Sequence, residues 1–504
     1  MSALSKLEQQ IEDYLAEILD DYEPKRYRDD KVIIDTIGGF IRLYPHEVAL
    51  VDTPLFQRLR NIFQASLATF TYPSINHSRF EHSLGCLSMA DKIICAIEQR
   101  SPGLLNKQEQ LELRIAALLH DVGHGPFSHA SESYYEEYKE IRDVKEEEPA
   151  LFKDASAHEI LGYLILKSAA FKRLWQKIVN LYEPVSKETK VLSHLNIDHV
   201  PLLILGKPFD RKKLFMAQII NGPFDVDKLD YLQRDGYFSG IQMALDIERL
   251  FLTIGVHTDK KTGIQSLYTD VGGATVLEQV MFNKMILFSS LYHHHKVRAA
   301  LLEINFLFDM IKSDETNKLN INGLRLKNVV DYLRIDDYDV LKSTHITDEL
   351  SNVVKRIKNR NLLKRALVIC PRSLKDSRAP MFASLQGNNT LREEIKKVIC
   401  NTDIPLSDVY VDCPKPPMFR GGALGSLIKL TDEDFITLED LYPASGWVSG
   451  YAEYRYRGYI FSRPGRESEV GKRARDILKA KGLELNEKAF LLAKQPKPPI
   501  AGSA

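Results

Sequence analysis

The sequence is poor in cysteine, and its few cysteines are not spaced for a shared task. Five cysteines stand among 504 residues, at positions 86, 95, 370, 400 and 413. Their number is odd and no two form a CxxC pair, which argues against a disulfide framework, a zinc ribbon and a dithiol redox site. This usage is typical of a reducing compartment, and we expect a cytoplasmic protein.

Long apolar runs and an excess of either charge are also missing. No stretch approaches the roughly 18 apolar residues that a membrane span requires, and residues 1–23 lack the basic start and apolar middle of a signal peptide. Sixty-eight basic residues balance 68 acidic ones, so the chain lacks the overall positive field of a dedicated nucleic-acid binder. We therefore expect no membrane partner, and the net charge identifies no other partner.

The chain is rich in hydrophobic periodicity. With 44% hydrophobic residues it can bury large cores. Leucine and isoleucine recur at helical spacing between residues 4 and 19, and similar patterns predict helices at 54–67, 83–99, 108–120, 158–166 and 276–311. Short strands are expected at 31–34 and 39–44, with a hairpin at 255–268.

Beyond about residue 330 the pattern changes to strand-like runs separated by loops that contain Pro and Gly. These runs lie at 365–369, 408–412, 427–430 and 451–461. We expect a mainly α fold with a smaller α+β C-terminal lobe. The expected order is an amphipathic helix at 1–30, a helical domain at 31–330, the α+β lobe at 331–493 and a disordered tail at 494–504.

Residues with metal-binding chemistry gather in three separate motifs. His120 and Asp121 end an apolar helix and open into the glycine-containing run 122–129; the upstream motif is His77-Ser-Arg79-Phe-Glu-His82, and the downstream motif begins Asp225-Val-Asp227. Imidazole and carboxylate ligands suit Mn, Fe, Zn or Mg to differing degrees. A single His-Asp pair is more often a hydrogen-bonded helix end, but three such clusters predict a metal site.

The motifs, taken in order, resemble a known family. Asp52-Thr-Pro-Leu-Phe-Gln-Arg-Leu-Arg60, Arg79-Phe-Glu-His82-Ser-Leu-Gly85, the run from His120 to His129, and Asp225-Val-Asp-Lys-Leu-Asp-Tyr231 are similar to motifs of the HD-domain deoxynucleoside triphosphate (dNTP) triphosphohydrolases, which include bacterial dGTPase-like enzymes. The resemblance covers roughly residues 31–300. It implies an HD-domain helical core in the domain expected at 31–330, and a metal-dependent, nucleotide-binding hydrolase.

Carried over position by position, the resemblance assigns the site residues. It implies that a divalent ion, either Mn, Fe, Zn or Mg, is held by His82, His120, Asp121 and Asp227. It implies that the substrate contacts are Gln64, Arg79, His124, His129, Lys228, Tyr231 and Asp235, with Gln64 and Asp235 near the sugar. The catalytic set is His158, as general acid to the leaving 5′ oxygen, with Glu132 to orient it, and His124. Each residue alone would more often be an ion pair or a helix cap, but the combination favours the functional interpretation.

The resemblance also implies control by a guanine nucleotide bound between subunits of a homo-oligomer, a dimer or a tetramer. The matching positions are Lys31, Val32, Asp52, Gln57 and Arg60, and for a second effector pocket His295 and Lys296. Asp52 can accept from the N1 and N2 donors of guanine, while Lys31 and Arg60 can neutralise phosphate. Alternatively, Asp52 belongs to a helix start, Gln57 and Arg60 are solvated, and the histidine run 293–295 is the polar face of a helix.

Two departures from the family limit the transfer. Residues 131–157 form a longer acidic stretch, in which Glu146, Glu147 and Glu148 are most simply a solvated face. No arginine stands near Met285, where the family contacts the terminal phosphate, and Lys284 and Arg298 are the available substitutes. The reaction implied is hydrolysis of a dNTP to deoxynucleoside and inorganic triphosphate. The alternatives are an HD phosphatase or phosphodiesterase acting on another nucleotide, and a non-catalytic nucleotide-binding or RNA-binding protein.

One further segment leaves a nucleic-acid partner open. Aromatic and basic residues are interleaved from Tyr451 to Arg457. They could stack on single-stranded nucleic acid, but an alternating edge strand explains the pattern more simply.

Overall fold

The computed structural model describes residues 2–182, 190–315, 319–342, 348–376, 380–414, 422–443, 446, 448, 450, 451 and 455–494. The tail expected at 494–504 therefore lies, except for Lys494, outside the described residues. The chain forms two compact units. Unit 1 comprises Met1–Leu287, Phe308–Leu350 and Phe419–Pro443, and unit 2 comprises Phe288–Leu307, Ser351–Met418 and Ala444–Ala504.

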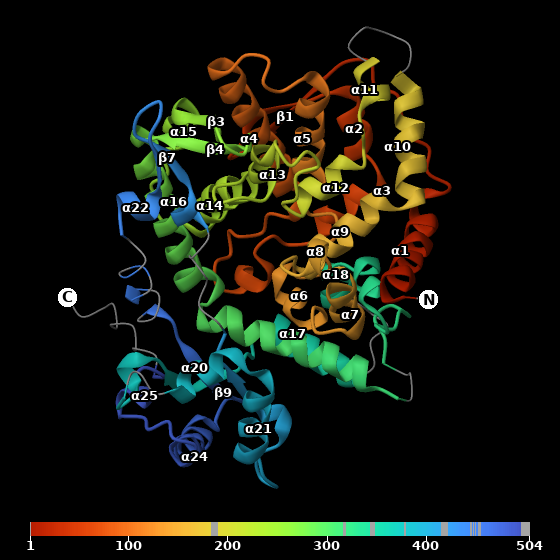
Figure 1. The fold of residues 1–504 in the computed structure, drawn as a ribbon. Coiled ribbons are helices and arrows are strands. Elements are labelled where there is room, and N and C mark those ends of the chain that lie inside the picture. Colours follow the sequence, from red (N-terminus) through yellow and green to blue (C-terminus); the bar gives the residue numbers. More distant parts are fainter. Residues whose placement is uncertain are drawn as a thin grey trace, which may run out of the picture. The chain divides into compact units, whose positions relative to one another are not determined.

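Unit 1 is mainly helical (Figure 1). Its α-helices before residue 170 are α1 (Ala3–Leu19), α2 (Pro45–Val51), α3 (Pro54–Gln57), α4 (Arg79–Arg100), α5 (Lys107–Leu119), α6 (His129–Tyr135), α7 (Lys139–Glu147), α8 (Pro149–Phe152), α9 (Ala157–Lys167) and α10 (Ala169–Tyr182). The later ones are α11 (Lys190–His194), α12 (His199–Ile204), α13 (Leu214–Ile220), α14 (Val226–Ser239), α15 (Ile247–Thr253), α16 (Val271–Leu287), α18 (Asp337–Lys342) and α22 (Leu438–Leu441). The predicted mainly α fold is confirmed.

The N-terminal helix is amphipathic, as predicted, and it packs on its own unit. Leu7, Ile11 and Leu15 are buried on one face of α1, which lies against α7, α9 and α10. Glu147, at the end of α7, accepts from the backbone N–H groups of Ala3 and Leu4 at 2.7 and 2.9 Å. The acidic stretch is therefore not only a solvated face, because one of its glutamates satisfies orphan donors at the start of α1.

Two small sheets complete unit 1. Strands β1 (Lys31–Asp35) and β2 (Gly39–Leu43) form an antiparallel hairpin. Strands β3 (Ile254–Thr258), β4 (Gln265–Asp270), β7 (Leu427–Lys429) and β8 (Phe435–Thr437) form the second sheet in that order. The hairpin predicted at 255–268 is confirmed by β3 and β4. The strand predicted at 427–430 pairs in parallel with β4.

Two predicted helices are interrupted. The helix expected at 54–67 breaks into α3, a 3₁₀ turn η1 (Arg58–Asn61) and a second one, η2 (Ser66–Phe70). Between the turns Phe63 forms a β-bridge with Ser78, and this pairing competes with helical hydrogen bonds.

The helix expected at 276–311 is divided into α16, a π-helical turn η3 (Phe288–Tyr292) and α17 (His295–Ser313). His294 Nδ1 accepts from the Lys296 N–H at 3.3 Å, so the polar histidine run caps a new helix.

Unit 2 is the α+β part of the chain. A three-stranded antiparallel sheet has the order β5 (Lys364–Ile369), β9 (Gly458–Ser462), β6 (Val409–Asp412). Helices α19 (Asp348–Lys358), α20 (Pro380–Gly387), α21 (Asn389–Ile399), α24 (Glu467–Ala480) and α25 (Lys488–Leu491) accompany it. β9 begins at Gly458 and is the central strand, so the expectation of an edge strand beginning at Tyr451 is wrong; residues 452–454 lie outside the described ones.

None of the helices in the described ranges is both long and apolar enough to cross a membrane. All five cysteines are described, and none of them forms a disulfide.

Candidate active site

Three helix ends bring the polar motifs of unit 1 together. α4 begins after Ser78, which forms a capping box with Glu81, and this places His82 in the first turn. α14 begins after Asp225, whose carboxylate accepts from the Lys228 N–H at 2.9 Å, so that the next residues enter the site. α5 ends at Leu119, directly before His120. Because α4 packs on both α5 and α14, these helix ends meet at one place.

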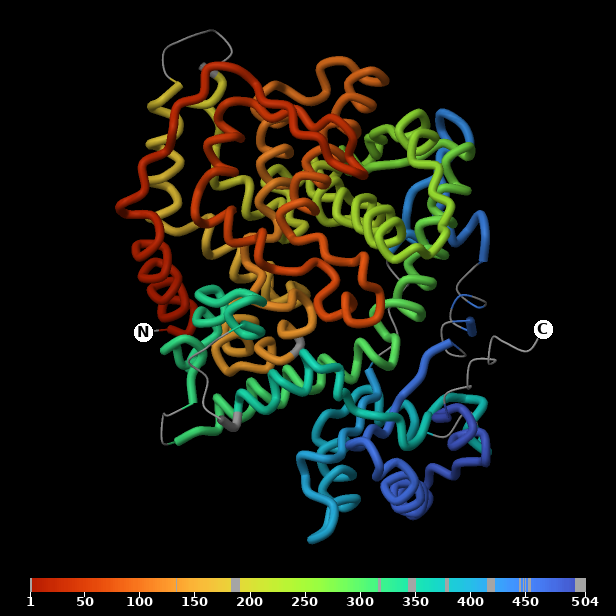
Figure 2. The backbone as a smooth tube through the Cα atoms, turned by 180° about the vertical axis from the view of Figure 1, so that it is seen from behind, coloured from red at the N-terminus to blue at the C-terminus, as the bar shows by residue number. Residues whose placement is uncertain are grey.

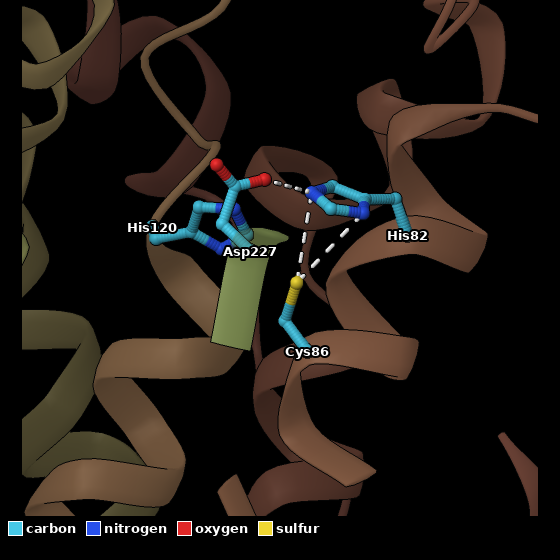
Figure 3. Close-up of side chains that lie close together, drawn as sticks. All are labelled: His82, Cys86, His120 and Asp227. Carbon is cyan, nitrogen blue, oxygen red and sulfur yellow. Dashed lines mark hydrogen bonds and ion pairs between the residues drawn. The ribbon is translucent and has the colours of Figure 1, made fainter. Parts of the chain in front are cut away.

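Three of the four expected metal ligands, His82, His120 and Asp227, have ligand atoms within 4.8 Å of one another (Figure 3), and Asp121 lies beside the two histidines. His82 Nε2 lies 3.0 Å from Asp227 Oδ1 and 3.7 Å from Asp121 Oδ2. His120 Nε2 lies 3.3 Å from Asp121 Oδ1. Ligands that are each about 2.0–2.2 Å from a shared ion stand roughly 3–3.6 Å from one another. This cluster of histidine and aspartate can therefore hold a divalent metal ion.

Hydrogen bonds orient both imidazoles toward such an ion. His82 Nδ1 lies 2.8 Å from Asp230 Oδ2, and His120 Nδ1 lies 2.8 Å from the Ala117 carbonyl oxygen. Each Nδ1 therefore donates, which leaves the lone pair of Nε2 for a metal. His120 Nε2 is buried and has no hydrogen-bond partner among the residues that the structure describes. A buried acceptor without a partner is costly, and a bound cation would satisfy it.

Cys86 is the fourth member of the cluster in Figure 3, but its position differs from that of a ligand. Its Sγ lies 3.5 Å from His82 Nε2 and 3.7 Å from His82 Nδ1. Near-equal distances to both nitrogens place the sulfur beside the ring rather than along the Nε2 lone pair. Burial raises the pKa of the Cys86 thiol well above its usual range, so a neutral thiol packs on the imidazole.

Asp121 stands between the metal cluster and a buried arginine. Its Oδ2 accepts from Arg79 Nη1 at 2.7 Å. Burial by itself would raise the pKa of Asp121, but Arg79 and the neighbouring histidines outweigh burial and hold it well below its usual value. Arg79 Nη2 is also buried, and it has no hydrogen-bond partner within the described part of the chain. One arm of this arginine is therefore fixed while the other can receive an anion.

A second cluster contains the expected acid. Glu132 Oε1 lies 2.6 Å from His158 Nδ1, and Glu132 Oε2 lies 2.7 Å from His129 Nδ1. The ring of His158 stacks on that of His124, with centroids 3.9 Å apart. Burial disfavours the charged form of His158, but Glu132 outweighs burial and raises the pKa of His158 to about 9. His158 is thus an oriented imidazolium at neutral pH.

The pKa of His124 moves in the opposite direction. His124 is fully buried, and burial together with the nearby charges of Arg79 and His158 holds its pKa well below the usual value. His124 Nε2 lies 3.4 Å from Asp121 Oδ1. A neutral imidazole therefore stands between the metal cluster and the charged His158.

The expected sugar-side and phosphate-side residues are also in unit 1. Gln64 is buried, and its backbone N–H donates to the His77 carbonyl oxygen at 3.1 Å. His77 Nε2 lies 2.7 Å from Asp235 Oδ1, so His77 links the two expected sugar contacts. Lys228 Nζ donates to the Gly222 carbonyl at 3.0 Å and pairs with Asp225.

The expected effector residues of unit 1 contact a tyrosine. The hydroxyl of Tyr27 donates to Asp52 Oδ2, and its ring lies 4.1 Å from Lys31 Nζ. Gln57 Oε1 accepts from Arg60 Nε at 2.8 Å. Val32 is 59% exposed on the hairpin. Asp52 follows α2 and precedes the N-cap of α3. Its backbone therefore lies at a helix boundary, as in the alternative interpretation in which Asp52 belongs to a helix start.

The other two expected effector residues, His295 and Lys296, line a cavity of about 430 Å³ within unit 2. Lys364 and Arg365 are part of the same wall. Burial, and then Lys364 and other nearby cations, lower the pKa of Lys296 to about 8. Positive charges are thus gathered in this cavity.

Two residues with evident roles were given none in the sequence interpretation. Asp230 orients His82 and is itself held by Arg234 at 2.8 Å; its spacing of three residues from Asp227, on one helix face, was the available signal. His77 binds Asp235 from 158 positions away, and no local pattern could have revealed that pairing.

Comparisons with known proteins agree with the motifs. A family model for the HD domain matches residues 79–235, and one for the HD-associated region matches residues 245–488. The deoxynucleoside triphosphate triphosphohydrolase SAMHD1 homolog of Dictyostelium discoideum is 28% identical over 356 residues, covering 68% of this chain and 61% of that protein. Deoxynucleoside triphosphate triphosphohydrolase SAMHD1 of Danio rerio is 34% identical over 223 residues, covering 44% and 35%. The chain spans less than two thirds of the length of both relatives.

A solved structure has the same fold. It is of a hypothetical protein from Aquifex aeolicus, with a TM-score of 0.62 and 22% identity over 88% of this chain and 99% of that one. The two matched regions account for most of the sequence, and the HD model spans all four residues of the metal cluster. The chain contains an HD domain followed by an HD-associated region, and it resembles the deoxynucleoside triphosphate triphosphohydrolases.

Proposed function

We propose that the chain hydrolyses deoxynucleoside triphosphates to deoxynucleoside and inorganic triphosphate. The observation that carries this proposal is the metal cluster beside an oriented His158, together with His120 Nε2, which has no hydrogen-bond partner in the described part of the chain. His82, His120, Asp121 and Asp227 would hold the ion. A divalent ion there would polarise a phosphoryl oxygen and lower the pKa of a bound water.

His158 supplies the proton for the leaving oxygen. The 5′ oxygen of the deoxynucleoside departs as an alkoxide, which needs a proton as the P–O bond breaks. With its pKa raised to about 9, the imidazolium is populated at neutral pH. Glu132 holds Nδ1, so the proton is donated from Nε2. Glu132 remains ionised, because His158 and His129 outweigh burial and hold its pKa well below the usual value.

Cations around the cluster suit a polyphosphate. Arg79 Nη2, which lacks a hydrogen-bond partner among the residues described, can donate to a phosphate oxygen. Of the two substitutes for the arginine missing near Met285, the structure favours Lys284. It is buried near the charges of Lys228, Asp225 and Asp227. Arg298 instead donates to Asp412 at 2.6 and 2.8 Å in unit 2, so it is already engaged.

Substrate orientation would come from the other expected contacts. Gln64 Oε1 is buried and lacks a hydrogen-bond partner among the described residues, so it can accept from a sugar hydroxyl. Asp235, held by His77, is suited to accept from a 3′ hydroxyl. His129, which is largely exposed, and Tyr231 are proposed to contact phosphate.

We also propose activation by a guanine nucleotide in a homo-oligomer. The residue types at Lys31, Val32, Asp52, Gln57 and Arg60 support it, as does the positive cavity that contains His295 and Lys296. In this structure the Tyr27 hydroxyl donates to Asp52, as the N1 and N2 donors of guanine would, and the Tyr27 ring lies near Lys31. An effector would therefore replace Tyr27.

A cytoplasmic location is also a proposal, which rests on the scattered, unpaired cysteines.

The second candidate is an HD phosphatase or phosphodiesterase that acts on another nucleotide. It is favoured by the absence of an arginine near Met285. A product assay separates the two: intact inorganic triphosphate and a deoxynucleoside support the proposal, whereas orthophosphate or pyrophosphate as the first product contradicts it. No turnover of any nucleotide across a panel, with metal bound, would favour a binding protein instead.

A further inference from the structure

A buried carboxylate far along the chain holds two loops that border the active site of unit 1. Asp337 begins α18 and is completely buried. Its Oδ1 accepts from the Phe127 N–H at 2.5 Å, although the two residues are 210 positions apart. Its Oδ2 accepts from the Phe63 N–H at 2.9 Å. Phe127 lies in the run between Asp121 and His129, and Phe63 precedes Gln64, so one side chain links the two loops.

The backbone that Asp337 holds is strained. Phe127 has φ 58° and Ser128 has φ 52°. L-residues rarely adopt this left-handed region, and they remain there only where the surroundings hold them. Phe127 is completely buried, so no water can replace the carboxylate as acceptor for its N–H. The Asp337 hydrogen bond is thus part of what keeps this turn in place.

The strained turn leads directly to the reactive groups. Ser128 Oγ donates to the Phe63 carbonyl oxygen at 2.6 Å and accepts from Arg79 Nε at 2.9 Å. Arg79 in turn donates to Asp121. A displacement of Phe127 and Ser128 would therefore move the guanidinium that faces the phosphates, and with it the loop that ends at His129.

The segment that carries Asp337 packs closely on the same turn. It contains a 3₁₀ turn, η4 (Val329–Arg334), followed by α18. A Cβ atom on Gly125 would lie 3.2 Å from Tyr332 Cβ and 3.3 Å from its carbonyl oxygen. Tyr332 also packs on Tyr135 of α6, with ring centroids 5.0 Å apart. Figure 2 shows this green to teal segment beside the red N-terminal helix, which η4 contacts.

We propose that Asp337 is a positioning residue of the active site, which fixes the turn at Phe127 and Ser128 and the loop at Phe63 so that Arg79 and Gln64 meet the substrate. The identity of that substrate rests on the proposed function. Burial raises the pKa of Asp337 to about 8, against the two backbone N–H donors, which favour the ionised carboxylate.

Two substitutions grade the loss of acceptors. Asp337→Asn keeps one oxygen acceptor and turns an NH2 group toward the second backbone N–H, whereas Asp337→Leu removes both acceptors. In the full chain loaded with Mn, we expect Asp337→Leu to lower kcat/KM for dGTP by about tenfold or more, with KM affected more than kcat, since misplaced binding groups weaken substrate contacts. We expect Asp337→Asn to lose less than Asp337→Leu, because it keeps one of the two acceptors. Metal content should be that of the wild type in both.

Amide hydrogen exchange tests the positioning without a substrate. Peptides that contain Phe63 and Phe127 should exchange faster in Asp337→Leu, while peptides of α4 and α5 should not change. Asp336→Asn is the matched control, since Asp336 accepts from the Asn61 side chain at 2.8 Å and not from either loop's backbone. Wild-type exchange at both loops in Asp337→Leu, or unchanged kcat and KM, would overturn the inference. A wild-type protein that cleaves no dGTP would contradict the proposed function. The hydrogen-exchange measurement would still test whether Asp337 positions the two loops.

Discussion

At the scale of single residues, the metal cluster depends on which imidazole nitrogen of His82 and His120 points into it. Asp230 and the Ala117 carbonyl fix His82 and His120 through Nδ1, and both Nε2 atoms therefore face Asp121 and Asp227. Cys86 is equally buried but lies beside a ring. Proximity alone does not make a ligand, and the direction of the lone pair distinguishes these side chains.

Metal analysis tests this distinction. We expect His120→Ala to lose bound metal, because an incomplete coordination shell holds an ion weakly. Asp230→Asn should weaken metal binding about 10- to 100-fold by disturbing the orientation of His82. Cys86→Ala is the control and should retain wild-type metal content. Elemental analysis after dialysis provides the measurement, and loss of metal from Cys86→Ala with retention in His120→Ala would reverse the assignment.

The pH dependence of activity tests His158. Its pKa of about 9 predicts that kcat/KM falls as pH rises through 9, because the acid form is lost. Glu132→Gln removes the negative charge that raises the pKa of His158, so the alkaline limb of the kcat/KM profile should move to lower pH. The folded-state pKa is above the ordinary 6.5, so the stability from this pair is complete below 6.5 and is lost as pH rises through about 9. An alkaline limb at the same pH in Glu132→Gln would contradict the role.

At the scale of elements, helix ends could be predicted better than helix continuity. Apolar spacing located the start of α9 and the end of α5, next to His158 and His120, to within one residue. It placed the start of α4 at residue 83, although the helix begins at Arg79 and includes His82. The breaks after α3 and α16 could not be predicted. One depends on the bridge of Phe63 with Ser78, and the other on a π turn before the histidine run. Both are contacts or hydrogen bonds that override local propensity.

The close approach of α4 and α14 gives a prediction for these elements. A Cβ atom on Gly85 would overlap the side chains of Asp230 and Arg234. We expect Gly85→Ala to destabilise the fold by about 1–3 kcal/mol through overpacking, and to lower metal content because Asp230 can no longer hold His82. Ser83→Ala, on the same helix, is the control. Denaturant unfolding and elemental analysis would measure the two effects. Wild-type stability and metal content in Gly85→Ala would contradict the prediction, because they would show that α4 and α14 can move apart to accommodate the methyl group.

At the scale of the whole molecule, the sequence predicted the classes of structure but not which segments would share a unit. The helical core and the α+β region were both foreseen from periodicity. Residues 331–350 and 419–443, expected in the C-terminal lobe, nonetheless belong to unit 1, through contacts such as β4 with β7 and Asp337 with Phe127. Parallel pairing and buried hydrogen bonds between distant residues leave no local pattern. The site residues were accessible because motifs are local, whereas their supports, His77 and Asp337, are not.

The proposed control by a guanine nucleotide gives the last prediction. Because Tyr27 donates to Asp52 and lies against Lys31, it would compete with the base of the effector. Asp52 raises the pKa of Tyr27 to about 12, so the hydroxyl remains a donor throughout the neutral range. Tyr27→Phe removes this hydrogen bond to a carboxylate, and we expect the GTP concentration for half-maximal activation to fall about tenfold.

A neighbouring tyrosine provides the matched control for that experiment. Tyr22 donates to the backbone oxygen of Asp52 at 3.0 Å and leaves its carboxylate alone, so Tyr22→Phe should activate at the wild-type concentration. The measurements are dNTP hydrolysis and sedimentation across a GTP titration. Since an effector that binds the assembled form better also favours assembly, the two curves should shift together in Tyr27→Phe. Activation that is unchanged in this variant but abolished in Asp52→Ala would retain the effector site and remove Tyr27 from its control.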